Sequence, residues 1–246
     1  MPEAEAAAAA AVEVLPGPVE GELELQWLET ALEGQSRRVI WHDRESLVVP
    51  GSYRRFPQLD AASRQFATMG WPVRVRRSGG GLVPQGPGIL NVTLALPVDG
   101  DGASGPGPAA EGVYRDLCTA LAEALSVLGI EARTQPVAGS FCDGRFNLAV
   151  RGRKIAGTAQ YWRRRGGRQA VLAHALLLVD VDPAVVTDIA NRFEAAIGSE
   201  RRYLAEASTS VVREARAGFA EVAPCLREAL LARLGTVRVS SSPQKP

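Results

Sequence analysis

The stretch 72-PVRVRRSGGGLVPQGPGILNVTLALPV-98 decides the fold, because a glycine-rich loop separates two segments with strand-like patterns. Residues 72–78 alternate apolar and basic side chains with period two, and residues 89–98 are rich in aliphatic and β-branched residues, so we expect a strand on each side. Three consecutive glycines let backbone bend sharply or approach a ligand closely, and exposed N–H groups there favour an anion. Taken alone, the three glycines are equally typical of a flexible turn, and they match neither GxxxxGK[ST] nor GxGxxG.

Upstream of this stretch, helical and strand-like patterns alternate. In 23–33, leucine and tryptophan at spacings of four, one and four fall on one helical face. We expect Asp60 to be the N-cap of a further helix that ends at Gly70. The segments expected here are a helix over 23–33, strands over 38–43 and 46–51, and a helix over 61–70.

Downstream, residues 99–112 (DGDGASGPGPAAEG) predict a flexible surface connection with little to bury. A leucine stripe then predicts a helix over 113–130 that Gly129 closes. We expect strands over 146–162, broken near Arg151 and Gly152, and over 169–182, then mainly helix over 183–234. These elements predict an α+β fold: a mixed, mainly antiparallel sheet with packed helices. No fixed-period repeat is visible.

Composition is that of a globular protein with no dominant charge. The chain has 246 residues, 46% of them hydrophobic, and a net charge of +1, which does not favour nucleic acid or a membrane as partner. Three scattered cysteines favour a reducing cytoplasm over a disulfide framework. We expect residues 1–20 to be a disordered lead-in without a basic targeting region, 21–236 a single catalytic domain, and 237–246 a polar tail.

Three motifs occur in a fixed order: 76-RRSGGGLV-83, 152-GRKIAGTAQ-160 and 174-HALLLVDVD-182. In combination they resemble the lipoate-protein ligase and octanoyltransferase family, the biotin/lipoate protein ligase type of catalytic domain. Its members carry an RRxSGGGAV-like loop, a GRKxSGSA-like strand with one essential lysine, and an HGTLL-like strand. In addition, 47-LVVPGSYRR-55 is similar to the family's glycine-containing strand, over which the acyl chain runs. The resemblance covers about residues 41–182.

Lys154 is unusual independently of any family. The chain has 26 arginines but only two lysines, Lys154 and Lys245, so positive charge is otherwise supplied by arginine. A compact ammonium reaches a buried carbonyl or phosphate oxygen where a planar guanidinium would not fit. The alternative is a lysine at a strand edge whose amine extends to solvent. By resemblance, Lys154 contacts the acyl carbonyl, with Ile155, Ala156, Gly157 and Ala159 leaving room for a ligand.

The resemblance also implies which residues bind the acyl group and its leaving group. Gln85 stands where related transferases have the histidine of HGPG, which puts an acid–base role there in doubt. His174 matches the HGTLL histidine, although the usual interpretation of a histidine in an apolar strand is a core residue whose ring nitrogens are hydrogen-bonded. Asn147 matches the asparagine of GRND-like segments. The implied binding residues are Arg76, Arg77, Ser78, Gly79, Gly80, Gly81, Gln85, Asn147, Gly157, Thr158, Ala159 and His174.

Cys142, in 139-GSFCDGRFNLAV-150, is the second candidate catalytic residue. One branch of the family carries the acyl group as a thioester on a cysteine upstream of the lysine strand. A nearby Lys154 or His174 would lower the pKa of such a thiol. Equally, Cys142 fits a small apolar residue that enters a strand. Cys118 and Cys225 lie on expected helix faces and fit the core.

Three functions remain open, and the resemblance orders them. The first is a ligase that attaches lipoate or octanoate to a lysine of a lipoyl-domain protein or glycine-cleavage H protein through an acyl-adenylate, with ATP and Mg²⁺. The second is a Cys142-dependent octanoyltransferase that uses acyl carrier protein and no cofactor; the short segment after Asp182, which lacks room for a full accessory domain, favours it. The third is a non-catalytic acyl-binding protein, motivated by Gln85. Biotin ranks below these ligands because no GRGRxGR-like loop is present.

Overall fold

A seven-stranded sheet forms the larger half of the molecule. The computed structural model describes residues 10–19, 23–98 and 107–237. Only the first two strands of the large sheet run parallel; every other neighbouring pair is antiparallel, so the predicted mixed, mainly antiparallel sheet is confirmed. In order across the sheet the strands are β1 (Glu13–Pro18), β2 (Arg37–His42), β6 (Ile89–Val98), β10 (Arg168–Leu178), β9 (Arg153–Arg165), β8 (Leu148–Val150) and β7 (Arg133–Thr134).

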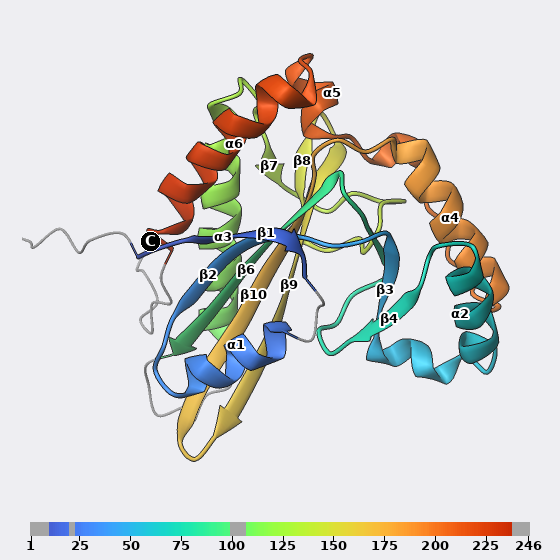
Figure 1. Cartoon of the computed structure of the whole chain (residues 1–246), viewed down its shortest axis with the longest axis horizontal. Coiled ribbons are helices and arrows are strands. Elements are labelled where there is room, and N and C mark those ends of the chain that lie inside the picture. The colour runs from blue at the N-terminus through green and yellow to red at the C-terminus, as the bar shows by residue number, and fades with distance from the viewer. Residues whose placement is uncertain (1–9, 20–22, 99–106, 238–246) are drawn as a thin grey trace, which may run out of the picture.

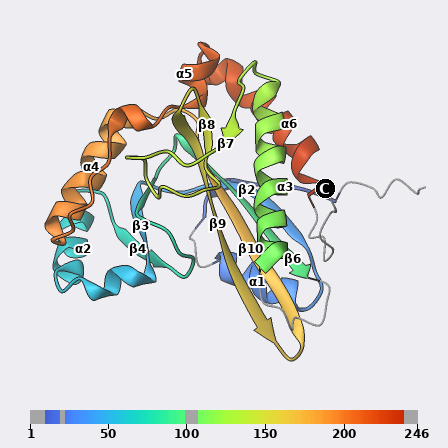
Figure 2. The same ribbon diagram turned by 180° about the vertical axis from the view of Figure 1, so that it is seen from behind.

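Helices cover both faces of this sheet. α1 (Leu23–Leu32) lies on one face, and α3 (Gly107–Ser126) and α6 (Phe219–Leu234) lie on the other, as the two opposite views show (Figures 1 and 2). The leucine stripe of α3 is fully buried against the sheet and α6. Trp27 and Leu28 of α1 pack on Trp41 and Leu172 from the opposite face. No helix in the described residues is both long and apolar enough to cross a bilayer.

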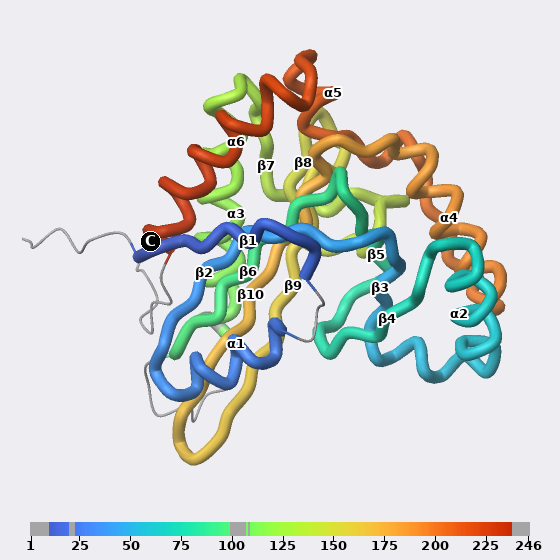
Figure 3. The backbone as a smooth tube through the Cα atoms, in the orientation of Figure 1, coloured from blue at the N-terminus to red at the C-terminus, as the bar shows by residue number. Residues whose placement is uncertain are grey.

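A smaller three-stranded sheet stands beside the large one and has its own core. Its order is β4 (Val73–Arg76), β3 (Ser46–Pro50) and β5 (Val83–Gln85), and β5 is visible in the tube view (Figure 3). The helices α2 (Leu59–Thr68) and α4 (Pro183–Ala196) pack with this sheet around Phe66 and Phe193, whose rings meet edge to face. The remaining short elements are η1 (Gly51–Arg55), η2 (Ala205–Ala207) and α5 (Val211–Ala215).

Period-two alternation in β6 and β10 sends apolar and polar side chains to opposite faces. Val92, Leu94 and Leu96 of β6 join the core under α3 and α6. The intervening side chains face the side that carries α1, since alternate residues of a strand point to opposite faces. His174 of β10 pairs directly with Thr93 of β6 across the sheet. The α1 side of the large sheet is therefore the polar-bearing side on which a site can form.

Most predicted elements are confirmed, including the turn at Arg151 and Gly152, where both residues have positive φ. Helix 61–70 is shifted, because α2 starts at Leu59 with Gln58 as its N-cap; Asp60 lies in its first turn instead of capping it. Gly70 takes a positive φ just after this helix, as expected for its terminator. The strands β5 and β7 were not predicted; they have three and two residues, too short for a periodic signal.

Two predicted termini, one predicted loop and one predicted helical region are wrong in part. Residues 13–18 of the expected disordered lead-in form β1, which pairs with β2 and adds an ion pair between Glu13 and Arg37. The expected connection 99–112 becomes helical from Gly107, as α3; its first part, 99–106, lies outside the described residues. Val237, assigned to the tail, is buried and its carbonyl accepts a hydrogen bond from Arg38. The predicted helical region after Pro183 is interrupted, since residues 199–210 are mostly irregular.

Candidate active site

A cavity of about 1140 Å³ has walls from both sheets and from α1. Apolar side chains of β3, β5 and β10, among them Val48, Val83 and Leu176, supply a wall suited to an acyl chain. Ten of the residues singled out in the sequence line it; Gly79, Gly80, Gly81 and Asn147 do not. The ten are Arg76, Arg77, Ser78, Gln85, Cys142, Lys154, Gly157, Thr158, Ala159 and His174.

Lys154 lies at the start of β9 with its side chain buried, so a lysine that extends to solvent is excluded. Its Nζ donates hydrogen bonds to the carbonyl oxygens of Phe141 and Cys142, the second at 3.2 Å. Burial lowers the pKa of Lys154 to about 8, against the opposing attraction of Cys142 and Asp143. The ammonium is therefore held beside Cys142 and is ready to lose its proton in mildly alkaline solution.

Gly157 lines the cavity and makes room for the Lys154 side chain. A Cβ at Gly157 would stand 2.8 Å from Lys154 Nζ and 2.9 Å from Cε. The expectation that Ile155 and Ala156 leave room for a ligand is wrong, because both are fully buried in the core on the other side of the sheet. Thr158 and Ala159 do line the cavity, and the Thr158 hydroxyl donates to the carbonyl of Phe146 at 2.6 Å.

Cys142 lies in a turn and not in a strand, so its interpretation as a residue entering a strand is wrong. Its φ of 51° is in the left-handed region, which costs a residue other than glycine about 1–2 kcal/mol. Asn147 supports this turn, because its Nδ2 donates to the Cys142 carbonyl at 3.3 Å. Strained backbone of this kind is often found at active sites.

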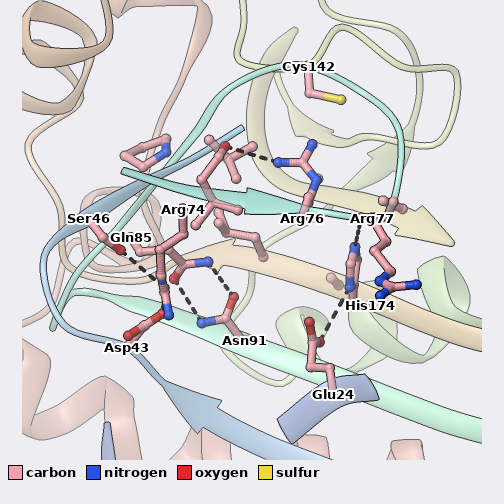
Figure 4. A pocket seen from close by; sticks show the side chains of 18 of the residues that line it. Glu24, Asp43, Ser46, Arg74, Arg76, Arg77, Gln85, Asn91, Cys142 and His174 are labelled. Carbon is pink, nitrogen blue, oxygen red and sulfur yellow. Dashed lines mark hydrogen bonds and ion pairs between the residues drawn. The ribbon is translucent and has the colours of Figure 1, made fainter. Parts of the chain in front are cut away.

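The glycine loop packs against the Cys142 thiol. Gly80 has a φ of +107°, and a Cβ added there would overlap Cys142 Sγ and stand 3.0 Å from Arg76 Nη2. Arg76 holds the loop on both sides of Gly80, since its Nη2 donates to the carbonyls of Gly79 at 3.0 Å and Gly81 at 2.7 Å. Figure 4 shows the Arg76 guanidinium next to Cys142. The glycines therefore let the thiol approach backbone and a cation, whereas we had expected them to surround the acyl group directly.

Two cations lie near Cys142: Arg76, whose guanidinium meets the same point at Gly80 as the thiol, and Lys154, whose Nζ donates to the Cys142 carbonyl. Burial lowers the pKa of Arg76, and Cys142 is the largest of the charges that oppose this change. Positive charge beside a nucleophile stabilises the negative oxygen that forms when a carbonyl is attacked. Burial raises the pKa of the Cys118 thiol to about 11, as suits a core residue. Cys225 is exposed, so its predicted place in the core is wrong.

His174 and Ser78 form a second polar group on the cavity wall. Ser78 Oγ lies 3.2 Å from His174 Nε2, and His174 Nδ1 lies 3.4 Å from a carboxylate oxygen of Glu24. Sequence reasoning missed Glu24. A signal was present: Glu24 precedes Trp27 and Leu28 by three and four residues, so it lies on the buried stripe of α1.

Gln85 is fixed by a reciprocal amide pair and is not free to act as an acid or base. Its Nε2 donates to Asn91 Oδ1 and its Oε1 accepts from Asn91 Nδ2, both at 2.9 Å. Both side chains are buried and line the cavity (Figure 4). Within the described residues, no cluster of three or more His, Cys, Asp or Glu is arranged to hold a metal ion.

Comparison with known proteins identifies the family. Residues 23–228 match the model of the lipoyl protein ligase A/B catalytic domain. The chain belongs to this family. It is accordingly an enzyme of the lipoate-protein ligase and octanoyltransferase group, and not the non-catalytic acyl-binding protein that was the third alternative.

Three relatives show how far the similarity extends. An uncharacterised protein of Cupriavidus necator is 49% identical over 210 residues, which is 80% of each chain. An octanoyl-[GcvH]:protein N-octanoyltransferase of Kyrpidia tusciae is 45% identical over 151 residues, covering 58% of this chain and 49% of that protein, so the match spans about half of its length. The lipoate-protein ligase-like fold is also seen in a putative lipoate protein ligase of Thermoplasma acidophilum (TM-score 0.64, 18% identity, 92% of this chain and 86% of that chain).

Proposed function

We propose that this enzyme transfers an octanoyl or lipoyl group between protein lysines through a thioester on Cys142. The observation that carries the proposal is the position of Cys142: its thiol packs on Gly80 beside Arg76, its carbonyl accepts from Lys154, and it lies at the wall of a cavity with an apolar side. A nucleophile near two cations has what acyl transfer requires, namely positive charge where the carbonyl oxygen becomes negative.

The reaction would proceed in two steps. In the first, the Cys142 thiolate attacks the donor carbonyl, a C–S bond forms, and the bond to the donor's leaving group breaks. In the second, the neutral amine of the acceptor lysine attacks the thioester, a C–N bond forms, and the thiolate is released. Lys154, with its ammonium buried beside Cys142, is the group placed to stabilise the oxyanion in both steps.

The names of the relatives support an acylated H protein as the acyl donor, in preference to free octanoate or lipoate. The Kyrpidia protein is named for transfer from octanoyl-GcvH, the octanoylated H protein, to another protein. We therefore add octanoyl-H protein to acyl carrier protein as the candidate donor, with a lipoyl-domain protein as acceptor. No ATP or Mg²⁺ is needed on this route, because the thioester is made directly from the donor.

The ATP-dependent ligase stays as the second candidate. Arg77, Ser78 and Lys154 all line the cavity, and such basic and hydroxyl groups also suit the phosphate of an acyl-adenylate. On this route ATP with Mg²⁺ would activate lipoate or octanoate, and Cys142 would be dispensable. The two candidates therefore differ in donor, in nucleotide requirement and in the role of one residue.

Intact-protein mass spectrometry separates them. The enzyme is mixed with apo lipoyl domain and one of three donors: octanoyl-H protein, octanoyl carrier protein, or octanoate with Mg-ATP. We expect modification without ATP, an octanoyl adduct on the enzyme, and loss of both in Cys142→Ser. Cys225→Ser, which removes an exposed thiol, is the matched control and should retain activity. Modification only with ATP, unchanged in Cys142→Ser, would contradict the thioester and establish the ligase.

A further inference from the structure

Five side chains form one hydrogen-bonded chain that runs from the core under α1 to the cavity. Trp41 Nε1 donates to Thr93 Oγ1 at 2.9 Å, and Thr93 Oγ1 donates to Glu24 Oε1 at 2.6 Å. The same carboxylate oxygen faces His174 Nδ1 at 3.4 Å, and His174 Nε2 faces Ser78 Oγ at 3.2 Å. Figure 4 shows the His174 ring between Glu24 and the loop that carries Arg77.

The chemistry of the groups fixes the direction of every bond in this chain except the one between His174 and Ser78, which reverses when the ring is protonated. The Trp41 indole only donates, so the Thr93 oxygen accepts from it and its own proton goes to Glu24. A carboxylate only accepts, so His174 Nδ1 carries the proton that faces Glu24. In the neutral ring, Nε2 is then the acceptor, and the Ser78 hydroxyl donates to it. The imidazole thus presents a basic nitrogen toward the cavity through Ser78.

Regular secondary structure holds each member in place. Thr93 and His174 are directly paired residues of β6 and β10, and adjacent paired side chains on one face of a sheet are close neighbours. Glu24 is held by the buried stripe of α1. Ser78 lies two residues before Gly80, whose backbone contacts the Cys142 thiol. The chain therefore ends on the loop that contacts Cys142, and Ser78 and Cys142 line the same cavity.

Electrostatics lower the pKa of Glu24 although its side chain is largely removed from water, with 15% of it exposed. Desolvation alone would raise the pKa of Glu24, but the charge and hydrogen bond of His174, the Thr93 hydroxyl and the charge of Arg76 together lower it. The carboxylate of Glu24 is therefore a fixed negative charge beside His174 Nδ1, at 3.4 Å.

We infer that Glu24, His174 and Ser78 form a proton relay for the lysine amines that leave and attack during acyl transfer, with Glu24 and Thr93 as positioning residues. This inference rests on the proposed thioester route. It assigns roles to two residues, Glu24 and Thr93, that no motif marked, and it gives His174 a task in the reaction that differs from acyl binding.

The protons balance over the two steps. When the Cys142 thiolate attacks an octanoyl-lysine amide, the C–S bond forms, the C–N bond breaks, and the leaving amine takes a proton from the His174 imidazolium through Ser78. When the acceptor amine attacks the thioester, the C–N bond forms, the C–S bond breaks to release the thiolate, and the proton lost by nitrogen returns to His174 through Ser78. The enzyme ends in its starting protonation state, so no external acid or base is consumed.

Two donors with different leaving groups test the relay. An amide donor, octanoyl-H protein, needs a proton on its leaving amine, whereas octanoyl carrier protein releases a thiolate that needs none. In Glu24→Gln we expect acylation of Cys142 by the amide donor, and discharge of the acyl-enzyme to apo lipoyl domain, to slow by about 10- to 100-fold. Acylation by the carrier-protein thioester should stay within about threefold of wild type. Glu24→Asp, which keeps the charge, should recover part of the loss.

Glu29→Gln is the matched control. Glu29 lies on the same helix but pairs with Arg163 and Arg165 and does not line the cavity, so all three rates should be those of wild type. Thr93→Val, which removes a donor to Glu24 without touching the cavity, should slow the two amine-dependent steps and spare the thioester step. If Glu24→Gln slowed the reaction equally with all donors, or did not slow it with any donor, the relay would be overturned. Activity of the wild type through a Cys142 adduct would still support the thioester route. Absence of any Cys142 adduct in wild type would overturn the thioester route itself, and the relay with it.

Discussion

Cys142 and Gly80 both have positive φ angles, and the two residues contact each other. The cysteine takes a left-handed φ of 51°, and the glycine takes a φ of +107°, a conformation that side chains rarely adopt. Together these conformations bring the thiol onto the loop that Arg76 ties down from both sides. A nucleophilic thiol gains from such a fixed partner, because its orientation then depends on rigid backbone and not on a mobile side chain.

Alanine at two adjacent glycines should therefore have different effects. Gly80→Ala places a Cβ onto the Cys142 thiol at a positive φ, so we expect a loss of about 1–3 kcal/mol in the free energy of unfolding and a slower reaction of Cys142 with iodoacetamide. At Gly79 nothing lies within 4 Å of an added Cβ and φ is not positive, so Gly79→Ala should change stability by less than about 0.5 kcal/mol. Urea unfolding and thiol alkylation measure the two effects. Equal behaviour of the two variants would contradict the proposed contact.

At the scale of elements, periodicity revealed the long strands and helices and missed what tertiary contacts create. The predicted strand 89–98 is β6 residue for residue, because seven of its ten residues are large aliphatic or β-branched and leave little ambiguity. β1 escaped prediction because it gains its structure by pairing with β2, a partner more than twenty residues away. The same limit applies to the site: the motifs located Lys154 and His174, but Glu24 joins them only through the packing of α1 on the sheet.

The buried carboxylate of Glu194 joins α4 to two other segments, and its loss should be costly. Its Oε1 accepts hydrogen bonds from the hydroxyls of Tyr53 at 2.5 Å and Tyr203 at 2.7 Å. Glu194→Ala leaves both hydroxyls without this acceptor, so we expect a loss of about 2–5 kcal/mol in the free energy of unfolding. Asp188→Ala on the same helix removes an exposed ion pair and should cost less than about 0.5 kcal/mol. Comparable urea midpoints for the two variants would refute a structural role of Glu194.

In the whole molecule, the polar site lies between two sheets, each of which has its own hydrophobic core. One core lies under α3 and α6, a second surrounds α2 and α4, and the cavity takes walls from both sheets. The site residues come from segments as distant as α1 and β10, so the site exists only in the folded chain. Such a location removes Lys154 from water, and burial of a charged lysine opposes folding. The chemistry proposed for Lys154 therefore comes at the expense of stability, as at many active sites.

This opposition has a measurable pH signature. The pKa of Lys154 is about 8 in the folded protein against 10.5 for the free side chain, so below pH 8 the lysine is charged in both states and its burial cost is fully present. Above pH 8 the unfolded chain holds more protons than the folded one, and stability rises with pH relative to a protein without this group. Lys154→Met lacks the titration. We expect the unfolding free energy of wild type minus that of the variant to increase by about 2 kcal/mol between pH 8 and pH 9.5, since each pH unit contributes about 1.4 kcal/mol.

The raised pKa values of Cys118 and Tyr53 also affect stability in alkaline solution, but both groups are present in each protein and cancel in the difference. Urea unfolding at half-unit pH intervals gives the curve, and acylation of Cys142 in the same samples should be lost in the variant. Parallel stability curves would show that Lys154 keeps the pKa of a solvated amine and is not the buried cation beside the thiol.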